Sequence, residues 1–155
     1  MAAGSGFTAA VDLTITKTLV GAASGTFTPP SGGAMWCSLY STQFTAAAKA
    51  GATEWTTGSN TNYARQSLGT GGTATSGWTI NAYSSGTGVV FTNFATLTQP
   101  APSSSQTLNA FGFCDSAGPT GGNIVIFADS ASPQTVNTGV QVIIAATTGA
   151  VFTTY

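Results

Sequence analysis

The chain has 155 residues, of which only 5 % are charged: three are basic, four are acidic and none is histidine. Ordinary soluble domains are about a quarter charged, so this sequence lacks most of the groups that enzymes use for proton transfer and metal binding. Three scattered cations also argue against nucleic-acid binding, which needs clustered Lys and Arg. We therefore expect a non-enzymatic protein without cofactor or metal, whose hydroxyl- and amide-rich surface contacts other proteins.

The balance of hydrophobic and charged residues predicts a folded chain that associates with itself. Hydrophobic residues make up 42 % of the sequence and the formal net charge is −1, whereas disordered chains combine low hydrophobicity with high charge. A net charge near zero gives little electrostatic protection against association. We expect a homo-oligomer, either a dimer or a trimer. The sequence contains no signal-peptide pattern and no apolar run of about 20 residues, so we expect synthesis in the cytoplasm and no membrane contact.

The first residues, 1–31, differ from the rest and predict an extended N-terminal arm. Small polar residues precede an alternating segment, and the Pro29-Pro30 pair follows it. The apolar positions of the alternating segment are Val11, Leu13, Ile15 and Leu19. One interpretation is a strand that pairs with a neighbouring subunit. The alternative is an ordinary first strand of the same domain, joined to it by a long loop.

Residues 32–155 predict one all-β domain. Short segments rich in aromatic and β-branched residues recur every ~10–16 residues between Gly, Ser, Pro and Asn clusters, a pattern typical of sandwiches and barrels. We expect a single antiparallel β-sandwich, jelly-roll or immunoglobulin-like, with helix only at Thr45–Ala50. The predicted strands are Ala34–Tyr40, Gly77–Tyr83, Val89–Leu97, Thr107–Cys114, Asn123–Ala128, Gly139–Ala146 and Ala150–Tyr155.

Cys37 and Cys114 lie far apart in the sequence and outside any C-x-x-C spacing. Without such a spacing they do not indicate a metal or redox site. We expect two buried, reduced thiols that act as small hydrophobic groups. A single disulfide is the alternative.

Most aromatic rings are expected in the core, where each contributes about 2–3 kcal/mol on burial. A carbohydrate-binding platform of exposed rings is the alternative. Trp55 stands in the polar run Gly51–Asn62, so among the aromatic residues its burial is the least expected.

Arg65 is the only arginine in the chain. A guanidinium is costly to bury unless carboxylates or backbone carbonyls pair with it, and the neighbouring Tyr63 and Leu68 suggest that this segment enters the core. We predict a structural anchor formed by Tyr63 and Arg65, with Asp115 as the candidate carboxylate partner.

Several short segments together resemble a family of small tailed-bacteriophage virion proteins. Asn62–Gln66 is similar to the family's Tyr-Ala-Arg-Gln motif, and Trp36–Tyr40 resembles the strand that precedes it. Downstream, further segments follow in the same order: Val89–Asn93, Ala110–Asp115, Gly118–Phe127 and Pro133–Gly139. The resemblance covers about Gly33 to Thr153, so it leaves out the N-terminal arm. Tyr40 stands where relatives often have His.

The resemblance implies a non-enzymatic structural subunit of a phage particle. Our first expectation is a capsid decoration or cement protein on the capsid exterior, with the major capsid protein and copies of itself as partners. The alternative is a tail-fibre or tail-tip module whose loops, Gly51–Asn62 and Gly69–Trp78, contact a host glycan. A carbohydrate-binding domain outside any phage is a third possibility.

Overall fold

The structure is a computed structural model that describes residues 5–7, 34–44, 52–56, 60–70, 78–84, 88–93, 96–119, 121–145 and 151–152. Every regular element in these ranges is a β-strand, and the strands pair antiparallel. The expected all-β fold is therefore confirmed. In chain order the strands are β1 (Ser5–Phe7), β2 (Ala34–Tyr40), β3 (Gln66–Thr70), β4 (Trp78–Ser84), β5 (Gly88–Asn93), β6 (Leu97–Thr98), β7 (Gln106–Cys114), β8 (Ile124–Val136), β9 (Ile143–Ile144) and β10 (Val151–Phe152).

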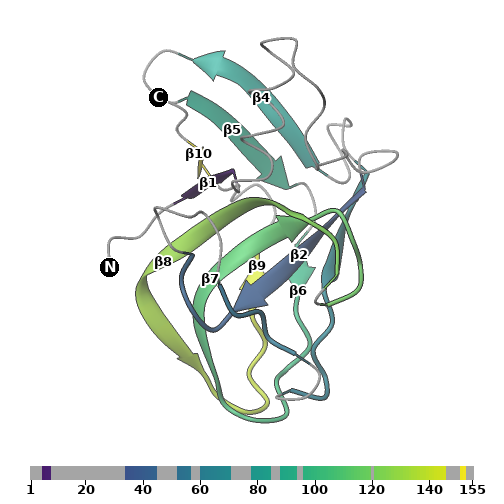
Figure 1. Cartoon of the computed structure of the whole chain (residues 1–155), viewed down its shortest axis with the longest axis vertical. Coiled ribbons are helices and arrows are strands. Elements are labelled where there is room, and N and C mark those ends of the chain that lie inside the picture. Colours follow the sequence, from purple (N-terminus) through teal and green to yellow (C-terminus); the bar gives the residue numbers. More distant parts are fainter. Residues whose placement is uncertain are drawn as a thin grey trace.

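A five-stranded sheet in the order β1-β8-β7-β2-β3 forms the centre of the molecule (Figure 1). The short β6-β9 ladder packs against one face of this sheet, and Leu97 of β6 and Ile144 of β9 join its core. This packing gives the two layers of an antiparallel sandwich. A separate sheet, β10-β5-β4, lies at one end of the molecule in Figure 1.

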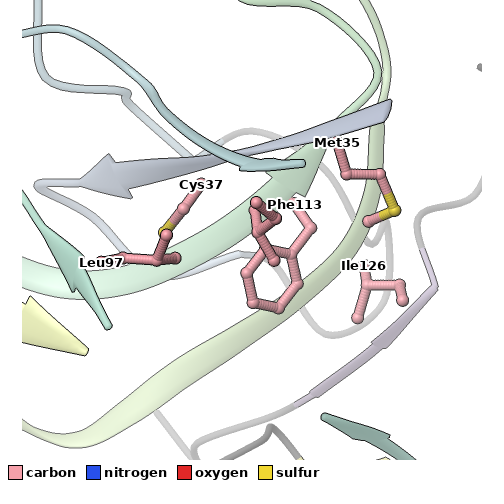
Figure 2. Packing of buried hydrophobic residues seen from close by; sticks show 6 residues of the cluster. Met35, Cys37, Leu97, Phe113 and Ile126 are labelled. Carbon is pink, nitrogen blue, oxygen red and sulfur yellow. The ribbon is translucent and has the colours of Figure 1, made fainter. Parts of the chain in front are cut away.

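Strand β2 and the second half of β7 are largely buried on both faces, which explains their mostly apolar sequences. Cys37 of β2 pairs with Phe113 of β7, so these two side chains share a face. Figure 2 shows Phe113 at the middle of this face, between Cys37 and Leu97 on one side and Met35 and Ile126 on the other. On the opposite face Tyr40, Phe44, Ala110 and Phe127 form a second cluster.

The two cysteines are buried and free, as expected. Cys37 lies opposite Phe113, whereas Cys114 lies opposite Trp36. Because side chains alternate between the faces of a strand, the two thiols point to opposite sides of the sheet. This arrangement explains why no disulfide joins them.

Strand β8 differs most from expectation, because it continues far beyond Ala128 to Val136. Its pairing with β7 moves from Ala110↔Asp129 directly to Leu108↔Gln134. The residues between Asp129 and Gln134 therefore form an excursion opposite the single residue Asn109. Pro133 lies within this excursion, where no ladder hydrogen bond is required of it.

Other elements also differ from the expected ones. Strand β3 was not predicted, while the expected segment Val89–Leu97 is divided between β5 and β6. The last two predicted strands are much shorter, as β9 and β10 have two residues each. The expected helix at Thr45–Ala50 lies outside the described residues. No described segment forms a helix with the length and hydrophobicity to cross a membrane.

Part of the predicted arm lies on the main sheet. Ser5–Phe7 forms β1, which pairs with Ile126–Ala128 of β8 and so makes one edge of the sheet. The four apolar arm positions Val11, Leu13, Ile15 and Leu19 lie outside the described residues, so their contact with a partner stays a prediction.

Candidate functional site

Glu54 and Arg65 form a buried ion pair. The Nε atom of Arg65 donates to Oε1 of Glu54 and the Nη2 atom donates to Oε2, each at 2.7 Å. Only 2 % of the Arg65 side chain and 9 % of the Glu54 side chain are exposed. A bidentate pair of this kind fixes the planes of both groups, and it loses far more when one partner is removed than an exposed pair does.

The third nitrogen of the guanidinium binds the turn between β7 and β8. Its Nη1 atom donates to the carbonyl oxygens of Ser116 and Gly121, both at 2.8 Å. Arg65 thereby connects the segment at residue 54, the start of β3 and the β7–β8 turn. The three segments are distant in sequence, so this one side chain fixes their relative positions.

The carboxylate that pairs with Arg65 is Glu54 rather than the expected Asp115. Both oxygens of Asp115 accept hydrogen bonds from Asn123, the backbone N–H at 2.6 Å and the side-chain amide at 2.8 Å. Asp115 also donates its own backbone N–H to the Asn123 carbonyl. Asp115 therefore closes the turn whose carbonyls bind Arg65, and it contributes to the same site without touching the guanidinium.

Tyr63 completes the cluster. Its hydroxyl donates to Oε1 of Glu54 at 2.7 Å and accepts the backbone N–H of Leu39 at 3.1 Å, which ties the cluster to β2. Burial, together with the hydrogen bond to Glu54, raises the pKa of Tyr63 well above its usual value. Burial acts to lower the pKa of Arg65, but the hydrogen bonds and charge of Glu54 outweigh it and raise that pKa.

Glycine is required at position 122 of the β7–β8 turn. Gly122 has a φ of +73°, and a Cβ atom there would lie 2.4 Å from both Oδ1 of Asp115 and Cβ of Ser116. Residues with a side chain avoid this φ region. The turn can therefore present its carbonyls to Arg65 only with glycine at this position.

A pocket of about 310 Å³ opens beside the ion pair. Glu54 and Arg65 contribute its charged wall, and Ala52 and Ile124 contribute apolar wall. Thr53 is exposed and Thr56 is half-buried, so two hydroxyl-bearing residues also line it. The pocket thus offers a combination of polar and apolar wall, and its two charges are already neutralised by each other.

Trp55, the aromatic residue whose burial was least expected, lies in the core with other aromatic rings. Its side chain is 1 % exposed and packs with Leu39, Tyr63 and Val136. The indole N–H donates to the carbonyl of Thr107 at 2.9 Å, which satisfies its only polar group. The polar neighbours of Trp55 in the sequence do not predict its exposure, because successive side chains of an extended segment point to opposite sides.

Glu54 was missed by the sequence reasoning, although one signal pointed to it. A buried arginine needs an acidic partner, and Glu54 is the only glutamate in a chain with four acids. No group of three or more potential metal ligands occurs among the residues that the structure describes.

One family model matches nearly the whole chain. It spans residues 9–151 and is described as podophage GP4 fiber I protein gp80. No curated protein matches the sequence. The match includes all of Glu54, Tyr63, Arg65 and Asp115, together with most of the strands. The chain therefore belongs to the podophage GP4 fiber I protein gp80 family, a family of bacteriophage structural proteins.

Proposed function

We propose that this protein is a non-enzymatic structural subunit of a podophage fibre. The family match over residues 9–151 carries the proposal, because the description of that family names a fibre protein. The expected role as a capsid decoration or cement protein remains a prediction, and no described contact favours it over the fibre.

The distribution of charge supports a role in assembly. The ion pair of Glu54 and Arg65 is turned inward, and Asp115 is committed to Asn123. The described surface instead exposes hydroxyl and apolar groups, including Val140 at 53 % and Ile143 at 60 % exposure. Burying unpaired charge in an interface costs several kcal/mol per ion, so a surface of this composition suits permanent contact with other subunits.

Electron cryomicroscopy of the parent particle tests this proposal. A fibre subunit should appear in a small number of copies that project from the tail. Density in many copies over the head, fitted by this fold, would instead support the cement role and overturn the fibre proposal. Antibody labelling of intact particles gives the same distinction without an atomic map.

A glycan-contacting function at the fibre tip is a second candidate, favoured by the pocket beside Glu54. The pocket is lined in part by Thr53 and Thr56, which belong to one of the loops predicted to contact glycan. Binding of the purified protein to a glycan array tests it. Binding should weaken when Thr53, an exposed residue, is replaced by a bulky Trp, and it should persist when Thr107, exposed on β7 away from the pocket lining, is replaced in the same way.

A further inference from the structure

Strand β1 is attached to the main sheet at a single edge. Ser5, Gly6 and Phe7 pair with Ala128, Phe127 and Ile126 of β8. Ile126 and Phe127 are each 4 % exposed, so the backbone that β1 covers belongs to the core of the domain. An unpaired edge at this position would leave ladder N–H and C=O groups without partners beside buried side chains.

The chain between β1 and β2 is far longer than the sheet requires. Strands β8 and β7 separate β1 from β2, so the two strands lie three inter-strand spacings apart, about 14 Å. Residues 8–33 could span roughly 85 Å if extended. The length of the connection therefore permits β1 to reach the β8 edge of an adjacent copy as well as its own.

We propose that the β8 edge at Ile126–Ala128 is an assembly site that receives β1 from a second copy of this chain. The exchanged strand forms the same three pairs in the same register, so exchange between identical copies changes the contacts of neither domain. In each exchange, residues 8–33 of the donor chain join the exchanged β1 to the donor's own domain, so the peptide chain itself links the two subunits. This inference does not depend on whether the protein belongs to the fibre or to the capsid.

The absence of charge in the partners favours the exchange. Neither Ser5–Phe7 nor Ile126–Ala128 contains a charged residue, so no like charges oppose each other when two copies approach. The formal net charge of −1 also leaves little long-range repulsion between copies.

Cross-linking between two single variants tests the exchange. Ser5→Cys and Ala128→Cys protein should be mixed in equal amounts in denaturant, refolded together and treated with a short bis-maleimide. Residues 5 and 128 are direct partners in the ladder, so exchange should produce a covalent dimer in the mixture but not in either variant alone. The native Cys37 and Cys114 are fully buried and should not react.

Thr107 and Thr135 provide the matched control. They are exposed partners on β7 and β8, two strands joined by the short Asp115–Asn123 turn. The double variant Thr107→Cys/Thr135→Cys should cross-link within one chain, and a mixture of the two single variants should give no dimer. If the Ser5→Cys and Ala128→Cys mixture gives no more dimer than this control, the exchange proposal is overturned. This holds even if the double variant Ser5→Cys/Ala128→Cys cross-links within one chain, because that result shows only that β1 pairs with its own β8.

A second measurement covers the case in which a cysteine variant fails to fold. Gly6→Pro in the full chain removes a backbone donor from β1, so it should convert oligomers to monomers in size-exclusion chromatography with light scattering. Gly4→Pro, just outside the bounds of β1, should leave the oligomer intact. An unchanged oligomer in Gly6→Pro, or a monomeric unsubstituted protein, would contradict the proposal.

Discussion

The two faces of the main sheet are held by different kinds of interaction. One face buries Met35, Cys37, Phe113 and Ile126 in a hydrophobic cluster. On the other face Ser38 of β2 donates to the Gly112 carbonyl and also hydrogen-bonds with the Tyr40 hydroxyl. Tyr40 lines the same pocket as the Glu54–Arg65 pair. The apolar face gains stability from buried volume. The polar face depends on the position of each donor and acceptor, so a small change there should have a specific effect.

The largest expected effect comes from the apolar face. Phe113→Ala removes a ring that is 2 % exposed, and we expect a loss of about 3–5 kcal/mol in the free energy of unfolding, because a cavity replaces the ring. Urea denaturation followed by tryptophan fluorescence measures this loss. Val140→Ala, at a residue that is 53 % exposed, should change stability by less than about 0.5 kcal/mol. Similar losses in both variants would show that Phe113 does not fill the core.

A somewhat smaller effect is expected from the polar face. Glu54→Gln keeps the size of the side chain but leaves the Arg65 guanidinium buried without its counter-charge. We expect a loss of about 3 kcal/mol, at the lower end of the range for breaking a buried ion pair. The same denaturation experiment measures it.

A double-mutant cycle sharpens this result. Combining Glu54→Gln with Arg65→Met removes both charges, so the double variant should be more stable than the sum of the single losses implies, by about 0.5–3 kcal/mol. Strict additivity would mean that the two groups do not interact in solution, which contradicts the geometry of the pair.

The turn that binds Arg65 should be sensitive to a single methyl group. Gly122→Ala places a Cβ against Asp115 and Ser116 at a φ of +73°, and we expect a loss of about 2 kcal/mol from backbone strain and the steric clash. Gly139 has a similar φ of +82° but nothing within 4 Å of the added Cβ. Gly139→Ala should therefore lose only about 1 kcal/mol. Equal losses of stability in Gly122→Ala and Gly139→Ala would show that the turn relieves the clash of the Cβ atom with Asp115 and Ser116 at no cost in free energy.

The last expected effect is absent at neutral pH and concerns the alkaline pH dependence of stability. Burial, with a contribution from Cys114, raises the pKa of Cys37 from 9.0 to about 12. Between these values the unfolded chain releases a proton that the folded chain keeps, so stability should fall as the pH rises, by up to about 1.4 kcal/mol per pH unit from this group. Below pH 9 the stabilisation is fully present.

Cys37→Ala isolates this contribution. Tyr40 and Tyr63, whose pKa values are also raised by burial, remain in both proteins, so the difference in slope between pH 9 and 11 reports Cys37. The free energy of unfolding at several pH values measures both slopes. Identical slopes would mean that the thiol ionises in the folded protein as readily as in the unfolded one.

The strands with strong local signals were predictable from the sequence. Strand β2 has the predicted bounds Ala34–Tyr40, and β7 begins one residue before the predicted Thr107. Both contain aromatic residues between turn-forming segments, so local propensity and tertiary burial both favour a strand there. Strand β3 lacked such a signal, because Gln66–Thr70 contains Ser and Gly and only one large apolar residue. It is a strand because Ser67 and Gln66 pair with Trp36 and Cys37 of β2.

The site was only partly predictable, because local sequence does not reveal which groups meet. The burial of Arg65 was predictable, because this only arginine of the chain stands close to the apolar residues Tyr63 and Leu68. The choice of Glu54 over Asp115 depends on the Asn123 side chain, which occupies one Asp115 oxygen eight residues along the chain. A competing local hydrogen bond of this kind becomes visible only once the β7–β8 turn is formed.

The excursion in β8 offers a position for labelling the intact particle. Ala131 and Ser132 are exposed, and the only β7 residue opposite the excursion is Asn109. Exposed loop tips of this kind accept inserted sequence with little loss of stability. A short epitope tag between Ala131 and Ser132 would leave the β1 edge and the Arg65 cluster unaltered, so it would mark the location of every copy while assembly continues.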